Sequence, residues 1–293
     1  RALPLLERAA ALDRHSVRVQ LRLAAVLRAQ RRFTEALRVF ERALELDPQS
    51  AWAWSGHAGT LAMLGRAEDA LAGLRRALAL APDEPFFHLQ QGEVLMMLNL
   101  FRAAADAFEK ALALAPDRAE TWAKLGQALR RLDDPEPALS AYDRALALDE
   151  RYAWAWHGRG LALEALDRCE EAEACYLKAL AIDDSVFWVH ANRVDVLIRM
   201  GHDAEAQEAS AVLVTRFPDQ ADGWARRGQV LRHARRYGEA LTAYERALAI
   251  NPADAWAWNG RGLALRALNR WDEALEAFVE ALAHDRSSVW YYH

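Results

Sequence analysis

Residues 119–152 read AETWAKLGQALRRLDDPEPALSAYDRALALDERY. Each half of this stretch carries apolar side chains three and four residues apart, which is the spacing of one face of an α-helix. Rows of the same 34-residue length follow one another from Val17 to Ser288 without an insertion or a deletion. A fixed period of this length predicts an array of helix pairs, and it overrides the two globular domains that 293 residues would otherwise suggest.

Small side chains mark one face of the second helix in every row. Alanine fills one column without exception, and a second column seven positions later, two helical turns on, is nearly as strict. A large residue stands between the two columns in seven of the eight rows. The three columns are Ala36, Ala70, Ala104, Ala138, Ala172, Ala206, Ala240 and Ala274; Ala43, Ala77, Ala111, Ala145, Ala179, Leu213, Ala247 and Ala281; and Phe40, Leu74, Phe108, Tyr142, Tyr176, Tyr244 and Phe278, with Ser210 as the exception. This pattern predicts that a neighbouring helix approaches closely.

Two kinds of turn residue separate the helices. Glycine, asparagine or aspartate stands between the first and second helix in six rows, and proline ends five rows, where a residue without an N–H stops the helix. These residues are Gly65, Asn99, Asp133, Asp167, Gly201 and Asn269, and Pro48, Pro82, Pro116, Pro218 and Pro252. In the first helix, Trp156, Gly160 and Leu163 form one stripe that is expected to face the second helix. Each row is therefore predicted to be helix, turn, helix, turn.

The chain resembles the tetratricopeptide repeat (TPR) family. The residues that carry the resemblance are Trp122, Leu125, Gly126, Ala138, Tyr142 and Ala145, together with the row-ending prolines. The resemblance covers the whole chain as eight repeats, 17–50, 51–84, 85–118, 119–152, 153–186, 187–220, 221–254 and 255–288. It implies an all-α fold, a right-handed superhelical solenoid of antiparallel helix pairs whose first helices line a concave, protein-binding groove.

Repeat 187–220 departs most from the pattern. Val194 stands in the glycine column, and Ser210 and Leu213 replace the usual large and small residues. Less regular packing is expected there. The two ends are also incomplete, because residues 1–16 match the second helix of an earlier repeat and residues 289–293 match the start of a further one. Neither end has a polar cap, so the sequence predicts one continuous solenoid domain that is a piece of a longer array.

Several function classes are disfavoured by composition. A formal net charge of −5 argues against a nucleic-acid-binding surface, and no segment has the run of about 18 apolar residues that a membrane span needs. Cys169 and Cys175 lie six residues apart on one predicted helix and point in different directions. With no disulfide framework and no signal-like segment, the expected location is the cytoplasm.

Reactive motifs are also missing from the sequence. Gly158-Arg159-Gly160 lacks the third glycine and the preceding strand of a dinucleotide fingerprint, and no Walker A or His-Glu-x-x-His motif occurs. His88 and His190 stand in a column otherwise held by tryptophan, which favours packing over metal binding. The chain is therefore expected to be no enzyme and to have no catalytic, cofactor-binding or metal-binding residues.

A longer period of 102 residues, three repeats, overlies the 34-residue one. Ala-Trp-Ala-Trp begins at Ala51, Ala153 and Ala255, and Phe86/His88 and Trp188/His190 follow it by one repeat. Two residues on a helix are about 200° apart, so the rings of one Trp-Ala-Trp cannot share a face. Trp54, Trp156 and Trp258 are predicted to be core, and Trp52, Trp154 and Trp256 to face the groove.

Three further features accompany the groove-facing tryptophans. Gly56, Gly158 and Gly260 each follow one of them by four residues, and a missing side chain there predicts a flat recess beside the indole. At the same two places, other repeats carry an amide beside the aromatic, Phe86/Gln90 and Trp188/Asn192, or an expected i,i+4 ion pair, Glu120/Lys124 and Asp222/Arg226.

These patterns give a hypothesis for a partner-binding face. Aromatic and arginine side chains dominate the energetics of protein interfaces, so exposed residues of both kinds on the first helices are candidate anchors. They are Trp52, Phe86, Trp154, Trp188, Trp256 and Trp290, with Arg28, Arg130, Arg131, Arg199, Arg232 and Arg266 one or two turns deeper. An equally open alternative is that the rings pack between neighbouring first helices and that the 102-residue period records duplication of a three-repeat segment.

The preferred function is a protein–protein interaction scaffold that binds a protein or peptide segment in its groove. One alternative is a sensor or regulatory arm, in contact with other domains of a longer parent chain that holds a signalling or defence NTPase or a transferase. Another is self-association through uncapped ends. No nucleic-acid, membrane or cofactor partner is expected.

Overall fold

The computed structural model describes residues 2–285, so Trp290 and the expected start of a further repeat lie outside the described residues. Over this range the chain forms seventeen α-helices and no strand. After α1 (Ala2–Leu12), the first helices of the repeats are α2 (Val17–Ala29), α4 (Ala51–Met63), α6 (Pro85–Met97), α8 (Ala119–Arg131), α10 (Ala153–Ala165), α12 (Phe187–Met200), α14 (Ala221–His233) and α16 (Ala255–Ala267). The second helices are α3 (Phe33–Leu46), α5 (Ala67–Leu80), α7 (Phe101–Leu114), α9 (Pro135–Leu148), α11 (Cys169–Ile182), α13 (Asp203–Arg216), α15 (Tyr237–Ile250) and α17 (Trp271–His284). The predicted alternation of helix pairs is confirmed.

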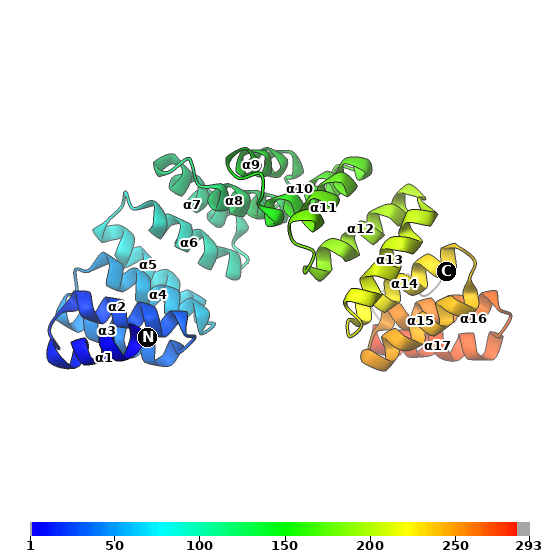
Figure 1. Cartoon of the computed structure of the whole chain (residues 1–293), viewed down its shortest axis with the longest axis horizontal. Coiled ribbons are helices and arrows are strands. Elements are labelled where there is room, and N and C mark those ends of the chain that lie inside the picture. Colours follow the sequence, from blue (N-terminus) through cyan, green and yellow to red (C-terminus); the bar gives the residue numbers. More distant parts are fainter. Residues whose placement is uncertain (1, 286–293) are drawn as a thin grey trace. The chain divides into compact units, whose positions relative to one another are not determined.

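The chain divides into two compact units, residues 1–150 and residues 151–293, called here the N-terminal and C-terminal units. Within each unit the two helices of a repeat pack against each other, and each second helix also packs on the first helix of the next repeat. First helices of successive repeats touch as well, as for α2, α4, α6 and α8 in Figure 1. The first helices of a unit therefore form one layer and the second helices another. Continuity of the array through Glu150 stays a prediction.

The small-residue columns are the core of both units. Every member of the two columns is at most 3% exposed, from Ala36 at 0% to Ala111 at 3%. The absence of longer side chains lets the second helix lie close to its neighbours, and the large residue between the columns fills the remaining space. Leu74, Phe108, Tyr142, Tyr176 and Tyr244 are at most 2% exposed. The sequence prediction for this face is confirmed.

The large rings pack against glycines of the first helices. A β-carbon built on Gly92 would lie 2.4 Å from Cε1 of Phe108 in the same repeat. One built on Gly260 would lie 2.3 Å from Cε1 of Tyr244, the ring of the preceding repeat, and Gly56 meets Phe40 in the same way at 2.2 Å. At Gly56 and Gly260 a ring of the preceding second helix therefore occupies the place of a side chain and makes the expected recess shallower, although Gly56 still lines a cavity together with Trp52.

Repeat 187–220 reaches the same packing by exchanging the two partners. Val194 stands where five other repeats have glycine, Ser210 stands where six have a ring, and both are fully buried. The valine supplies the volume that the serine lacks, and the Ser210 hydroxyl donates to the carbonyl oxygen of Gln207 at 3.1 Å. Phe187 and Phe217 add an edge-to-face pair, with ring centroids 5.5 Å apart. The departures of this repeat from the pattern compensate one another.

Every turn between a first and a second helix contains one residue in the left-handed region. The predicted turn residues all adopt it, with φ between 57° for Asn99 and 76° for Gly65. Arg31 and Arg235 hold the same position in their repeats, with φ of 62° and 58°. Arginine rarely adopts this conformation because its β-carbon crowds the backbone, so both turns are strained relative to those with glycine.

The row-ending prolines contribute their carbonyl groups to the next first helix. The indole N–H groups of Trp54, Trp122, Trp224 and Trp258 each donate to the carbonyl oxygen six residues earlier, at 2.8 to 2.9 Å. The imidazoles of His88 and His190 reach the equivalent carbonyls of Pro82 and Asp184, at 2.7 and 3.0 Å. Trp54 and Trp258, expected in the core, are half-buried, since their indole edges reach this surface turn.

Candidate functional site

The predicted aromatic anchors lie on the exposed face of the first helices. Trp52 is 53% exposed, Trp188 52%, Trp256 41% and Trp154 36%, and Phe86 is half-buried. Trp52 stacks on Phe86 at 5.8 Å between ring centroids with an interplanar angle of 22°. The structure thus places Trp52 and Phe86 side by side within the N-terminal unit.

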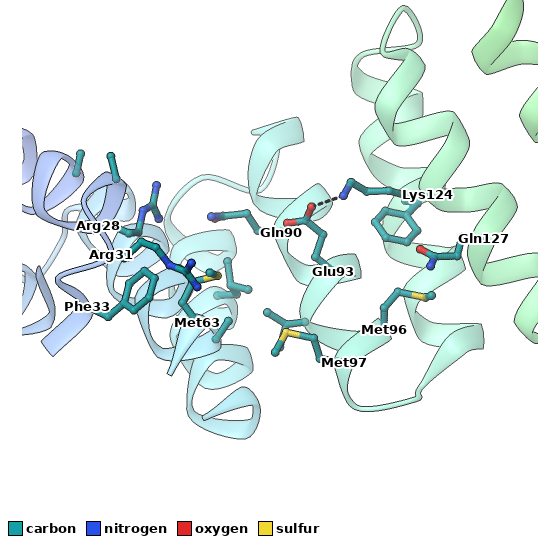
Figure 2. A pocket seen from close by; sticks show the side chains of 17 residues that line it. Arg28, Arg31, Phe33, Met63, Gln90, Glu93, Met96, Met97, Lys124 and Gln127 are labelled. Atoms are coloured by element: carbon teal, nitrogen blue, oxygen red, sulfur yellow. Dashed lines mark ion pairs between the residues drawn. The ribbon is translucent and has the colours of Figure 1, made fainter. Parts of the chain in front are cut away.

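Two adjoining cavities lie on this face of the N-terminal unit. The larger, about 750 Å³, runs over α2, α4, α6 and α8, and the smaller, about 370 Å³, lies over α2, α4 and α6. They share Ala25, Arg28 and Gln90. We call the two together the N-terminal groove, and Figure 2 shows the side chains that line the larger cavity.

Apolar side chains form much of the wall of the groove. Trp52 and Phe86 border the smaller cavity, while Met63, Met96 and Met97 point into the larger one (Figure 2). Met63 is 58% exposed and Met97 is 52% exposed. Methionine is flexible and polarisable, so a cluster of this kind adapts to apolar groups of different shapes.

The charged lining of the groove is mostly basic. Its cationic residues are Arg18, Arg22, Arg28, Arg31 and Lys124, and Glu93 is the anionic one. The Glu93 carboxylate lies 2.7 Å from Lys124 Nζ, so it is already neutralised (Figure 2). Within residues 2–285 the four arginine side chains form neither an ion pair nor a hydrogen bond. Burial lowers the pKa of the half-buried Arg28, which indicates a cation that lacks a counter-charge.

A polar recess lies at the centre of the groove, at Gly59. A β-carbon built there would lie 2.9 Å from Nη1 of Arg28 and 3.1 Å from Nε2 of Gln90. The Ser55 hydroxyl donates to Oε1 of Gln90, so the amide N–H₂ of Gln90 faces the guanidinium. Two groups that only donate hydrogen bonds therefore meet above a residue with no side chain.

In the C-terminal unit the equivalents of Ser55 and Gln90, His157 and Asn192, also bind each other. Asn192, 102 residues after Gln90, donates from Nδ2 to Nε2 of His157 at 2.9 Å. Arg226 binds both carboxylate oxygens of Asp195 at 3.0 Å and lies over the Trp256 ring, 5.8 Å from its centroid. Burial raises the pKa of Asp195 even beside this cation.

The expected ion pair of Arg226 with Asp222 is wrong. Arg226 instead donates to the Asp222 backbone carbonyl at 3.4 Å, because Asp195 on the preceding first helix offers both oxygens. Glu120 and Lys124 do pair, at 3.3 Å, yet Lys124 lies closer to Glu93. The Lys124–Glu93 and Arg226–Asp195 pairs are related by 102 residues, so this period places ion pairs between repeats.

The predicted arginine anchors have different surroundings. Arg131 lies over the Phe101 ring at 4.4 Å, and Arg199 pairs with Asp167 at 2.7 Å. Arg232 and Arg266 line a cavity of about 410 Å³ with Trp271. Within the described range, Nε of Arg130 and Nε of Arg232 are buried and have no hydrogen-bond partner. Of the predicted set, only Arg28 lies with Trp52 and Phe86 in the N-terminal groove.

Several groove residues were not among the predicted anchors. Arg18 and Arg22 share one stripe of α2 with Ala25, and the three methionines of the groove occur within 35 residues of one another. The sequence signal that could have identified this part of the groove is the spacing of methionine, because three of the four methionines of the chain occur in this short stretch. The role of Gly59 had no signal in the sequence, since it depends on which side chains of α2 and α6 meet above it.

Six family models match the chain, and all describe the tetratricopeptide repeat. The matched residues are 1–51, 27–91, 119–152, 155–185, 228–268 and 255–288. The chain belongs to the tetratricopeptide repeat family. This TPR fold is one of protein-interaction scaffolds, and no catalytic family is among the six matches. A comparison with curated proteins finds no match.

Solved TPR structures share the fold. A tetratricopeptide repeat protein from Parabacteroides merdae has a TM-score of 0.65 at 14% identity, covering 85% of this chain and 98% of its own. The Cut9–Hcn1 assembly of APC/C gives 0.63 at 18%, covering 95% and 55%. YrrB, described as a TPR protein with an unusual peptide-binding site, gives 0.53 at 23%, covering 64% and 97%.

The described residues hold neither a candidate metal site nor a candidate membrane span. From Ala2 to Asp285, no three or more His, Cys, Asp or Glu side chains gather in a way that could hold a metal ion. None of the helices in the same range is both long and apolar enough to cross a lipid bilayer.

Proposed function

We propose that this TPR protein is an interaction scaffold that binds a peptide segment of a partner protein in the N-terminal groove. The observation that carries the proposal is the pair of adjoining cavities, about 750 and 370 Å³, lined by the first helices α2, α4, α6 and α8. Cavities of this size accommodate several side chains, and stacked repeats present such extended surfaces for binding.

The exposed apolar residues of the groove support the same function. Trp52, Met63 and Met97 are each more than half exposed, although their repeats bury smaller side chains almost completely. Exposed apolar side chains that adjoin one another usually mark a surface where another molecule binds. YrrB, whose fold is similar, is described as binding a peptide, which is consistent with this use of the fold.

Selection of peptides on the full chain tests the proposal. Random twelve-residue peptides displayed as a library are enriched on the protein, and recovered peptides are then cross-linked to a chain carrying a photoreactive phenylalanine at position 63. The control carries the same group in place of Glu109, which is exposed on the second helix α7. We expect cross-links at position 63 and background at position 109. Equal labelling at both positions, or no recovered peptide, would refute the proposal.

The alternative of a regulatory arm in a larger parent chain concerns sequence beyond residues 1–293 and stays a prediction. Peptide binding in the N-terminal groove is compatible with it, because such an arm also acts through a partner segment.

A further inference from the structure

We propose that the donors around Gly59 bind carboxylate groups of an acidic peptide segment, whose apolar side chains lie against Trp52 and the methionines of the groove. The inference rests on the proposed function and specifies the chemistry of the partner.

Gln90 is held in one orientation by Ser55. Its amide oxygen accepts the hydrogen bond of the Ser55 hydroxyl, and both side chains are buried, Ser55 at 1% exposure and Gln90 at 9%. A buried bond of this kind fixes the amide, so the N–H₂ group points toward Arg28. Neither group can accept a hydrogen bond from the other, because both carry only donors on the facing side.

The donors of Arg28 and Gln90 face the space beside Gly59. Apart from the α4 backbone, Arg28 and Gln90 are the only described groups within 4 Å of a β-carbon built on Gly59, and Glu93, the acid in the groove wall, is bound to Lys124. A carboxylate offers two acceptor oxygens and a negative charge, which matches a guanidinium beside an amide N–H₂. A neutral ligand carbonyl would leave the Arg28 charge without a partner in a partly desolvated place.

The spacing of the groove arginines favours a segment with several acids over a single chain terminus. Arg18, Arg22 and Arg28 lie along one side of α2, and Arg18 and Arg28 are ten residues, about 15 Å, apart. Arg31 extends the row into the following turn. One terminal carboxylate cannot reach all four, whereas acidic side chains along an extended or helical segment can.

Small side chains lie among the arginines of the groove. Ala25 lies between Arg22 and Arg28, Ala29 lies between Arg28 and Arg31, and both alanines line the groove. Across from these alanines, Met63 and Met97 lie on one side of the recess. The stacked rings of Trp52 and Phe86 lie on its other side. An acidic segment with large apolar residues on both sides of a carboxylate therefore fits this lining.

The experiment uses the same peptide selection, with amino-acid composition as the readout. We expect peptides recovered on the full chain to be enriched in Asp and Glu over the starting library, and the enrichment to disappear on Arg28→Gln/Arg31→Gln. Arg76→Gln, an exposed arginine on the second helix α5, is the matched control and should leave it unchanged. Peptides that cross-link at position 63 without an acidic excess would overturn this inference and leave the proposed function intact. Recovery of no peptide would overturn both.

A second variant separates binding from folding. Gly59→Ala places a methyl group between the Arg28 and Gln90 donors, 2.9 Å from the end of a flexible side chain, and alanine favours the helix over glycine. We expect a recovered acidic peptide to bind this variant about tenfold more weakly or worse, with an unchanged or higher thermal midpoint. Unchanged affinity would overturn the assignment of Gly59 as the recess.

The source of the carboxylate and the part played by charge are tested on the same peptide. Amidation of its C-terminus should leave the affinity within about twofold, and replacement of its acids by Gln and Asn should lower it at least tenfold. Raising the salt concentration should weaken the binding of the acidic peptide and leave the binding of the neutral peptide unchanged. A large loss on amidation with no loss on neutralisation would overturn the acidic segment in favour of a chain terminus.

Discussion

In the N-terminal unit the donors of Arg28 and Gln90 lie beside Gly59, whose missing side chain leaves space for a ligand group, whereas in the C-terminal unit Asn192, the equivalent of Gln90, donates to His157. Leu161 stands there in place of the glycine, 102 residues after it. Arg226 of the C-terminal unit pairs with Asp195, as Lys124 at the equivalent place of the N-terminal unit pairs with Glu93. What distinguishes the N-terminal groove is therefore the glycine, which leaves the Arg28 guanidinium and the Gln90 amide N–H₂ beside an unfilled space.

The rings that surround the exposed tryptophans also differ between the two units. Trp52 stacks on Phe86, and both border a cavity. In the C-terminal unit Trp154 lies 5.9 Å from Tyr152 and Trp188 lies 5.0 Å from Phe187, each beside a ring one or two residues earlier in the chain. Repetition of sequence therefore conserves the backbone of the array and not the surroundings of each exposed ring.

The largest expected effects concern what the units share, the ring between the two alanine columns. Phe108→Ala and Tyr244→Ala each remove a fully buried ring, and each should lower the free energy of unfolding by about 3–5 kcal/mol. Urea denaturation followed by far-ultraviolet circular dichroism measures this loss. Thr242→Ala, at an exposed position of α15, is the control. A loss below about 1 kcal/mol in one unit would contradict the equivalence of the two cores.

The next comparison uses the groove tryptophans. Trp52→Ala should weaken peptide binding at least tenfold, about 1.4 kcal/mol, because a stacked indole of the groove wall is lost. Trp154→Ala should leave peptide binding unchanged and lower stability by about 1–2 kcal/mol, since its ring is nearly two-thirds buried. Fluorescence polarisation and urea denaturation give the two values. Equal loss of affinity in both variants would show that Trp154 also contacts the ligand.

A smaller pair of effects separates strain from binding. Arg31→Gly and Arg235→Gly relieve the same left-handed backbone conformation, and each should stabilise the protein by about 0.5–1 kcal/mol. Of these two arginines only Arg31 lines the N-terminal groove, so only its replacement should also weaken the binding of an acidic peptide. If Arg235→Gly weakened peptide binding as much as Arg31→Gly does, the C-terminal unit would have to take part in binding.

The smallest effect is a pH dependence in the C-terminal unit. Burial lowers the pKa of His190 below its ordinary value near 6.5, so the unfolded chain binds a proton more readily. The contribution of neutral His190 to stability is therefore present above about pH 6.5 and is lost as the pH falls through the lowered pKa. His190→Trp keeps a donor to the carbonyl six residues earlier, as in four other repeats.

Urea midpoints at pH 7.5 and pH 5.5 measure that dependence. We expect the wild type to lose more stability on acidification than His190→Trp, and His57 and His233, whose pKa values burial also lowers, to account for the remaining loss. An identical loss in wild type and variant would mean that His190 titrates alike in the folded and unfolded chain.

Helix boundaries and turns could be predicted because local rules decide them. The 34-residue period, the alanine columns and the turn residues placed each helix pair, and the structure confirms them. The strained turns at Arg31 and Arg235 had no local signal, because arginine itself disfavours that backbone and only the packing of the two helices imposes it.

The candidate site could be predicted only in part. Alternation along the helix identified Trp52 and Phe86 as exposed, and the structure brings them together. The same reasoning assigned Arg199 to the site, although it pairs with Asp167 in the preceding repeat. Sequence spacing gives the face of a helix and does not give the side chain that reaches across from the next helix.

The sequence by itself determined the repeat family, the alternation of helices and the face that each alanine column buries, since these follow from spacing along one chain. The tertiary structure decided which rings fill which glycines, and which donors remain without an acceptor. Those outcomes depend on contacts between helices about 34 residues apart, such as Ser55 with Gln90 and Arg226 with Asp195. A carboxylate-binding recess at Gly59 is therefore a property of three packed helices, and no one repeat of the sequence contains it.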